Sequence, residues 1–282
     1  MRIDCHHHFW DVTPERTARI RAMDRGNNHI WLAVHGPEEL APQLAAIEFD
    51  KTVLVEAWDS GIEENLHWMR RAEELDSVGA VIGWANPFAS DFAELLDAYV
   101  QFPKFRGVRF RGNFFRDPNW LRQTEVHAAI GELASRDGLS LDMHLAKPLL
   151  TEIPLIAAEN PGFPMNLNHL ANPQLDEPGH FEPWARLMEP LREVPKLTFK
   201  LSAITEFAGD NPTPELLRPA ARFMIDTYGC ERLMYGSNWP VSRMAMEYQE
   251  TYEMTMAAVG ELPAADRDRL LGGTAAEYYR VS

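Results

Sequence analysis

Short apolar runs alternate with amphipathic stretches along the 282 residues of the chain. The runs are rich in β-branched and other apolar side chains and have the length of buried strands. They predict eight strands, at residues 3–9, 52–58, 78–85, 105–111, 139–145, 164–169, 197–202 and 233–238. Apolar residues at helical spacing predict helices between them, most clearly at residues 63–75, 91–101, 121–136 and 214–228.

Strands that alternate with helices are typical of a parallel sheet, and eight such units are the number that closes a barrel. We therefore predict an α/β fold, a single (β/α)₈ TIM-like barrel domain over residues 1–282. Residues 13–42 form a long connection after the first strand. Because the loops after barrel strands build the active site, we expect this segment to be a lid or insertion. A surface excursion without function is the alternative.

Composition limits the kinds of partner and the cellular compartment that we expect for the protein. The formal net charge of −15 disfavours a polyanionic partner such as nucleic acid. Two cysteines without a CxxC pair exclude a disulfide scaffold and suit a reducing compartment. Neither a signal-peptide pattern nor a membrane-length apolar run is present, so we expect a cytoplasmic protein without membrane contact. The sequence leaves the oligomeric state open, a homo-oligomer included.

The first predicted strand carries three consecutive histidines. Side chains alternate along a strand, so we expect Asp4, His6 and His8 to share one face, with Cys5 and His7 on the other. Two imidazoles at this spacing can converge on one metal ion. An HxH pair on its own is a weak signal.

Other predicted strands end on polar residues of the same kind. The alternation in residues 139–145 turns Asp142 and His144 towards the barrel axis. The next strand ends on His169, and the last one ends on Asn238. The carboxyl ends of barrel strands meet at one rim, where catalytic residues lie. We therefore predict that these side chains gather in one active site.

Several motifs in chain order resemble the amidohydrolase superfamily. The resemblance, to its amidohydrolase-2 type, covers the whole chain. Within that type the chain is similar to the lactonase branch, which holds sugar-lactone (fuconolactone and rhamnonolactone) and pyrone-dicarboxylate lactone hydrolases. The motifs that carry it are Ile3-Asp4-x-His6-x-His8, Phe9-Trp10, Gly83-Trp84, Gly107-Val108-Arg109, Lys200-Leu201-Ser202, the run 232–241 and the terminal segment 274–279.

The resemblance implies a hydrolase that acts on a cyclic ester, most simply a sugar-derived 1,4- or 1,5-lactone. Water attacks the ring carbonyl, and a cation or metal stabilises the oxyanion. One alternative is a metal-dependent decarboxylase or hydratase of a small unsaturated or aromatic acid. The other is a barrel with impaired catalysis or a binding function.

Position 238 departs from the family, which usually has Asp where this chain has Asn238. An amide is no general base, although Asn238 can still orient a water molecule. Glu56, His144 and Asp142 are the candidates for a base elsewhere in the barrel. An ion pair with Lys200 or Arg109 is the alternative for Glu56, and a hydrogen bond that fixes a histidine tautomer is the alternative for Asp142.

The expected cofactor depends on which of two mechanisms applies. One divalent metal, zinc first, would be held by His6, His8 and His169, with an open position for water. Metal-independent catalysis is the alternative, with imidazoles and Arg109 around the oxyanion. A guanidinium at this place could instead hold a substrate carboxylate.

The substrate is expected to be a small lactone held by aromatic and polar side chains. Eight tryptophans favour a sugar ring, whose C–H faces stack on indoles, although ordinary packing explains most of them. The predicted substrate-binding residues are Trp10, Trp31, Arg111, Asp142 and Trp239.

Overall fold

The computed structural model describes residues 1–282 except 23–25, 27, 58–61, 113–114 and 116. Its strands form one parallel eight-stranded sheet in sequence order. They are β1 (Ile3–His7), β2 (Lys51–Val55), β3 (Val78–Gly83), β4 (Phe105–Arg111), β5 (Ser140–His144), β6 (Met165–Leu167), β7 (Leu197–Leu201) and β8 (Leu233–Tyr235).

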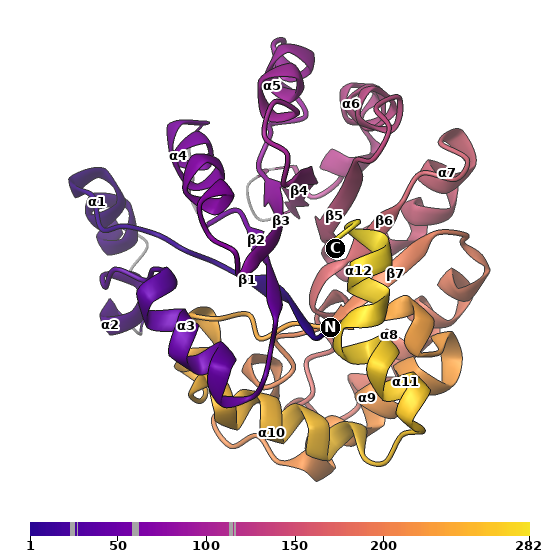
Figure 1. Cartoon of the computed structure of the whole chain (residues 1–282). Helices are drawn as coiled ribbons and strands as arrows, with labels where there is room; N and C mark the ends of the chain where they lie inside the picture. Colours follow the sequence, from indigo (N-terminus) through magenta and orange to yellow (C-terminus); the bar gives the residue numbers. More distant parts are fainter. Residues whose placement is uncertain (23–25, 27, 58–61, 113–114, 116) are drawn as a thin grey trace.

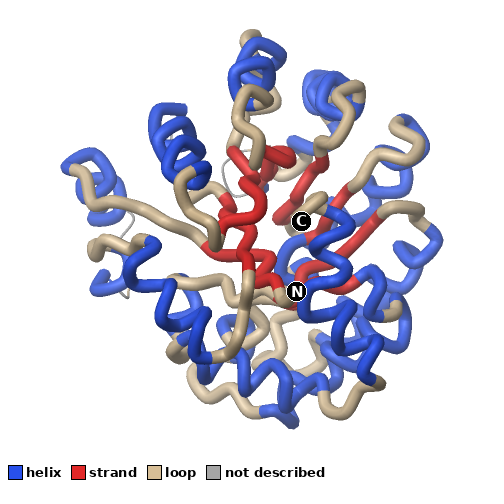
Figure 2. The backbone as a smooth tube through the Cα atoms, viewed as in Figure 1, coloured by secondary structure: helices blue, strands red, loops and turns tan. Residues whose placement is uncertain are grey.

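The sheet closes on itself just beyond the last strand. The amide of Asn238 donates to the carbonyl of His6 at 2.8 Å, and the amide of His8 donates to the carbonyl of Trp239 at 2.8 Å. The predicted (β/α)₈ barrel is therefore confirmed. Figure 2 shows the strands at the centre and the helices around them.

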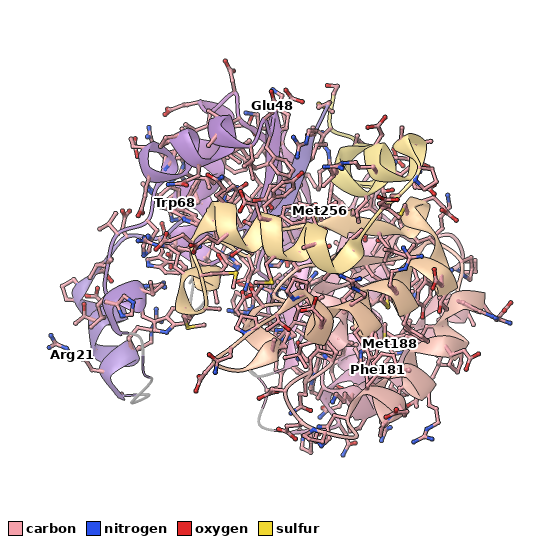
Figure 3. All side chains as sticks on the ribbon, turned by 90° about the horizontal axis from the view of Figure 1, so that it is seen from below. Arg21, Glu48, Trp68, Phe181, Met188 and Met256 are labelled. Carbon is pink, nitrogen blue, oxygen red and sulfur yellow. The ribbon has the colours of Figure 1, made fainter. Side chains whose placement is uncertain are left out.

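Helices surround the barrel, and most of them, α3 to α10, pack apolar side chains in one cluster with the outward faces of the strands. Their bounds are α1 (Pro14–Ala22), α2 (Asn28–Trp31), α3 (Pro37–Ala46), α4 (Ile62–Glu73), α5 (Phe92–Tyr99), α6 (Thr124–Ala134), α7 (Ile153–Glu159), α8 (Phe181–Met188), α9 (Pro214–Tyr228), α10 (Tyr248–Val259), α11 (Ala264–Asp268) and α12 (Thr274–Tyr278). Figure 3 shows α8 and α10 in this outer layer, with Phe181, Met188 and Met256 labelled. Among the described residues, no helix is both long and apolar enough to cross a bilayer.

The two ends of the chain lie near each other beside α12, at the centre of the view in Figure 1. Tyr279 and Val281, just after α12, pack in one apolar cluster with Ile3 and with Val53 of β2. This cluster fills the amino-terminal end of the barrel, so the opposite end, where the strands finish, is left for the site.

Several predicted strand ends need correction. The predicted strands 3–9, 52–58 and 78–85 stop at His7, Val55 and Gly83. Two others, 164–169 and 233–238, stop at Leu167 and Tyr235. Beyond these points His169 has φ 56° and Asn238 has φ 58°, in the left-handed region that side chains other than glycine seldom adopt. Such a backbone cannot continue a strand. The last residue of the predicted strand 52–58 lies outside the described residues.

The strict alternation expected for the first strand is wrong. The pairing of β1 with β2 shifts in register between Asp4 and His7. Asp4 accepts a hydrogen bond from the hydroxyl of Tyr248 on α10 at 3.0 Å, whereas Cys5 packs with Val53 inside the barrel. The irregularity places Cys5, rather than Asp4, in the barrel interior.

Candidate active site

A cavity of about 300 Å³ lies at the carboxyl ends of the strands. Its polar wall consists of His8, Arg109, Arg111, His144, His169, Glu206 and Asn238, and its apolar wall of Trp10, Trp31, Ala203, Phe207, Val241 and Met244. Barrel enzymes carry their chemistry at this end, so the cavity is the candidate active site.

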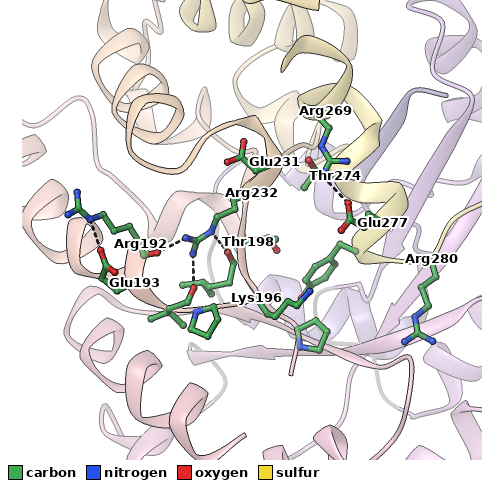
Figure 4. A pocket seen from close by; sticks show the side chains of 15 residues that line it. Arg192, Glu193, Lys196, Thr198, Glu231, Arg232, Arg269, Thr274, Glu277 and Arg280 are labelled. Carbon is green, nitrogen blue, oxygen red and sulfur yellow. Dashed lines mark hydrogen bonds and ion pairs between the residues drawn. The ribbon is translucent and has the colours of Figure 1, made fainter. Parts of the chain in front are cut away.

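A larger concavity of about 530 Å³ lies at the other end of the barrel (Figure 4). Several of its charged groups are already paired. The Arg232 guanidinium donates to backbone carbonyls, including that of Leu197 at 2.7 Å, and Arg269 pairs with Glu277 at 2.9 Å. Its position before the strands begin also separates it from the face where barrels hold catalytic groups.

The histidines predicted from the strand ends come together. The ring centroids of His6 and His169 are 4.5 Å apart, those of His6 and His8 are 4.9 Å apart, and those of His144 and His169 are 5.2 Å apart. His6 lies beneath the cavity, and the other three line it.

Each imidazole of the cavity wall is oriented by its neighbours. His8 Nδ1 lies 2.8 Å from the carbonyl oxygen of Glu56, so this nitrogen carries the proton and Nε2 remains an acceptor. His169 Nδ1 is 2.8 Å from the hydroxyl of Ser202, while its Nε2 accepts from Arg109 Nη2 at 3.1 Å. His144 Nε2 contacts the side-chain amide of Asn172 at 2.9 Å.

The imidazoles are held in their neutral form. Burial, followed by nearby positive charges, lowers the pKa of His6, His8 and His169 well below the usual 6.5. Burial and the charge of Arg109 lower the pKa of His144 to about 3. At neutral pH these rings are weak bases.

Glu56 is part of an ion-pair network below the cavity wall. Its Oε1 lies 2.9 Å from Arg111 Nε and 3.4 Å from Arg109 Nη1, and its side chain has no exposed surface. The carboxylate fixes both guanidinium groups at the end of β4, where they line the cavity. This arrangement favours the ion pair with Arg109 over a role of Glu56 as base.

Asp142 forms a second buried ion pair, deeper in the barrel. Its Oδ2 lies 2.6 Å from Lys200 Nζ, and both side chains are fully buried. Its carboxylate also accepts from the Tyr279 hydroxyl at 3.0 Å and from Asn168 Nδ2 at 3.1 Å. Asp142 does not line the cavity, and among the described residues its carboxylate contacts Lys200, Tyr279 and Asn168 rather than a histidine ring, so its predicted contact with substrate gains no support. Asn168 thus contacts the Asp142–Lys200 pair.

His6, His8 and His169 do not fit a metal site as they are arranged. Arg109 occupies the nitrogen of His169 that would bind the ion, and Lys200 Nζ lies 3.3 Å from His6 Nδ1. Two positive charges thus stand beside two of the three ligands that a divalent cation would need. The described part of the chain contains no group of three His, Cys, Asp or Glu side chains placed for a metal.

Glu206 is a site residue that the sequence analysis missed. It begins the short 3₁₀ turn Glu206–Ala208, which follows β7, and it lines the cavity. Asn238 Nδ2 donates to Glu206 Oε1 at 2.7 Å, and the hydroxyl of Thr205 donates to Oε2 at 2.6 Å. Burial, its largest influence, raises the pKa of Glu206, while these two bonds act in the opposite direction.

Two of the predicted tryptophans form the apolar wall. The rings of Trp10 and Trp31 stack with centroids 5.6 Å apart and an interplanar angle of 20°. Trp239 lies outside the wall, buried edge-on against His35 at 5.5 Å. Trp31 belongs to α2 and lies in the predicted lid segment 13–42, which also contains α1 and the start of α3. Among the described residues of this segment, Trp31 is the one that lines the cavity.

The chain is similar to known proteins over almost its whole length. The family model described as amidohydrolase matches residues 3–281. A curated L-fucono-1,5-lactonase of Burkholderia ambifaria is 29% identical over 99% of this chain and 96% of its own length. The protein y4mH of Sinorhizobium fredii is 31% identical over 99% of this chain and 98% of its own length.

Among solved structures, an amidohydrolase of Burkholderia multivorans described with bound zinc has a similar fold. Its TM-score is 0.90 at 24% identity, and the match covers 100% of both chains. At this identity the likeness concerns the fold. The zinc is a property of that protein.

Proposed function

The chain belongs to the amidohydrolase family, and from that premise we propose that it hydrolyses a small sugar-derived 1,4- or 1,5-lactone to the open hydroxy acid. The observation that carries the proposal is the cavity itself. Guanidinium groups, imidazoles and two stacked tryptophans line it together.

Arg109 and Arg111 supply the charge that ester hydrolysis requires. The attack of water on a ring carbonyl places negative charge on the carbonyl oxygen, and fixed donors aimed at that oxygen stabilise it. The two guanidinium groups are held in place by Glu56 before substrate arrives, so little reorganisation is needed. His8 Nε2, His144 and Asn238 are placed to contact the water or the ring oxygens.

The stacked tryptophans suit the remaining part of a sugar lactone. Their faces offer apolar contact to the C–H groups of a saturated ring, while the guanidinium groups of the same cavity offer donors to its hydroxyls. We propose that Trp31 makes this contact from the segment 13–42, which would then close over bound substrate as a lid.

Amidohydrolases generally use a divalent metal, and a bound metal would supply Lewis-acid stabilisation of the oxyanion. The positions of Arg109 and Lys200 beside His169 and His6 favour hydrolysis without one. We therefore assign the stabilisation of the oxyanion to the arginines and derive no step through a metal.

Hydrolysis of aldonolactones tests both parts of the proposal. The release of protons is followed on L-fucono-1,5-lactone and on a panel of 1,4- and 1,5-lactones, before and after chelation, with the metal content measured on the same sample. We expect turnover that chelation does not abolish. No turnover on any lactone would contradict the proposed reaction. If the purified protein holds a stoichiometric metal and loses its turnover when chelation removes that metal, the proposed metal independence is wrong.

A further inference from the structure

Resting on the proposed function, we propose that Glu206 is the catalytic base that takes the proton of the attacking water, and that Asn238 positions it. The carboxylate that this reaction needs would thus stand on the loop after β7, next to the residue at the end of β8. The assignment rests on the composition of the cavity wall, on the contacts of Glu206 and on the contacts of the competing groups.

Glu206 is the one carboxylate among the described residues that line the cavity. The other two acidic residues predicted for the site lie elsewhere. Glu56 pairs with two arginines and Asp142 pairs with Lys200, and neither has an exposed side-chain surface. Glu206 keeps partial exposure to the cavity, so a water molecule can reach it.

The contacts of Glu206 leave its carboxylate able to accept a proton. A carboxylate has about four lone-pair positions. Asn238 uses one on Oε1 at 2.7 Å, and the hydroxyl of Thr205 uses one on Oε2 at 2.6 Å. The remaining positions are available to water, and the two neutral donors orient the group without cancelling its charge.

The imidazoles of the wall are poorer bases. The acceptor nitrogen of His169 is engaged by Arg109, and that of His144 contacts Asn172. Nε2 of His8 remains an acceptor, but burial lowers the pKa of His8 as it does that of His144 and His169. Burial instead raises the pKa of Glu206 towards the pH of the reaction. A base becomes more effective as its pKa approaches the working pH.

Asn238 is compatible with Glu206 in a way that an aspartate would not be. An aspartate at position 238 would bring a second carboxylate to the distance at which the Asn238 amide now donates, 2.7 Å. Two like charges at this separation cannot both ionise near neutral pH. The amide removes the repulsion and replaces it with a hydrogen bond, so Asn238 and Glu206 form one unit.

The placement of Glu206 allows it to carry one proton through the hydrolysis of the lactone. The water oxygen forms a bond to the lactone carbonyl carbon while Glu206 takes one of its protons. The bond between that carbon and the ring oxygen then breaks, and the proton passes from Glu206 to the departing alkoxide. The product is the hydroxy acid, whose ionisation releases the proton that the assay records.

The test compares four proteins on the lactone that wild type hydrolyses fastest. They are wild type, Glu206→Gln, the double variant Glu206→Gln/Asn238→Asp, and Glu261→Gln as a matched control on the surface. The measurements are kcat, KM and the pH profile of kcat/KM, corrected for uncatalysed hydrolysis, with circular dichroism to establish folding. The other charged or titratable groups that face the cavity are Arg109, Arg111, His8, His144 and His169.

We expect Glu206→Gln to lower kcat by about 10²- to 10⁴-fold, the range of general-base catalysis, with a small change in KM. The acid limb of the pH profile should disappear with it, since the buried imidazoles ionise at lower pH. The double variant, which returns a carboxylate to the end of β8, should recover at least about tenfold of the lost kcat. Glu261→Gln should match wild type.

Two results would overturn the assignment in distinguishable ways. If wild type hydrolyses lactones and a folded Glu206→Gln stays within about threefold in kcat, Glu206 is not the base and the proposed function stands. If wild type hydrolyses no lactone at all, the proposed function fails and the assignment fails with it.

Discussion

Replacing Lys200 with methionine should destabilise the barrel strongly. The Lys200 ammonium lies 2.6 Å from Asp142 Oδ2, and neither side chain has exposed surface. Without its cation the Asp142 carboxylate would remain buried with two neutral donors, Tyr279 and Asn168. Removing one partner of such a pair costs about 3–5 kcal/mol of the free energy of unfolding.

This loss of stability can be measured as a fall in the melting temperature, Tm. For domains of about 150–250 residues, a loss of 1 kcal/mol lowers Tm by about 2–4 °C. Applied to this chain, a loss of about 3–5 kcal/mol should lower the Tm of Lys200→Met by about 6–20 °C. Urea unfolding at pH 7, followed by circular dichroism, gives the free energy itself. The exposed Lys196→Met is the control and should stay within about 0.5 kcal/mol of wild type.

The double variant Asp142→Asn/Lys200→Met separates the charge from the packing. Removing both charges leaves no unpaired ion, so we expect the double variant to be more stable than Lys200→Met alone. The reasoning is refuted if Lys200→Met costs less than about 1 kcal/mol. It is also refuted if the double variant is no more stable than the single one.

Three further predictions address other parts of the molecule. Arg109→Met should lower kcat on neutral lactones by about 10²- to 10³-fold if its guanidinium stabilises the oxyanion, and an unchanged kcat would assign it to a substrate carboxylate instead. Trp31→Ala should raise KM by about two- to tenfold with little change in kcat, and steady-state kinetics that show the reverse would exclude stacking on substrate. Burial lowers the pKa of His7 from 6.5 to about 3, so the unfolded chain binds one more proton between these values and stability falls as the pH drops through this window. His7→Gln should therefore reduce the slope of unfolding free energy against pH by about 1.4 kcal/mol per unit between pH 4 and 6, and an unchanged slope would show that His7 does not remain neutral in the fold.

The barrel was predictable because its strands are short apolar runs with regular helical stretches between them. The sequence could not indicate where a strand changes its backbone. In the predicted strand 164–169 the apolar pattern continues, but the chain turns left-handed at His169 after Leu167. At β1 the register shift reverses the faces of Asp4 and Cys5, and no side-chain pattern marks such an irregularity.

Glu206 escaped sequence reasoning because it lies beyond the strands, where alternation no longer assigns a face. Glu56 and Asp142 were predicted as candidates because strand alternation turns them inward. Inside this barrel, however, Glu56 pairs with Arg109 and Arg111, and Asp142 pairs with Lys200, so neither carboxylate is available at the cavity. The asparagine at position 238, where the family usually has aspartate, was itself an indication in the sequence. If the reaction uses a carboxylate base as we propose, a chain with Asn238 takes it from elsewhere at the same rim, and the loop after the neighbouring strand places Glu206 beside Asn238.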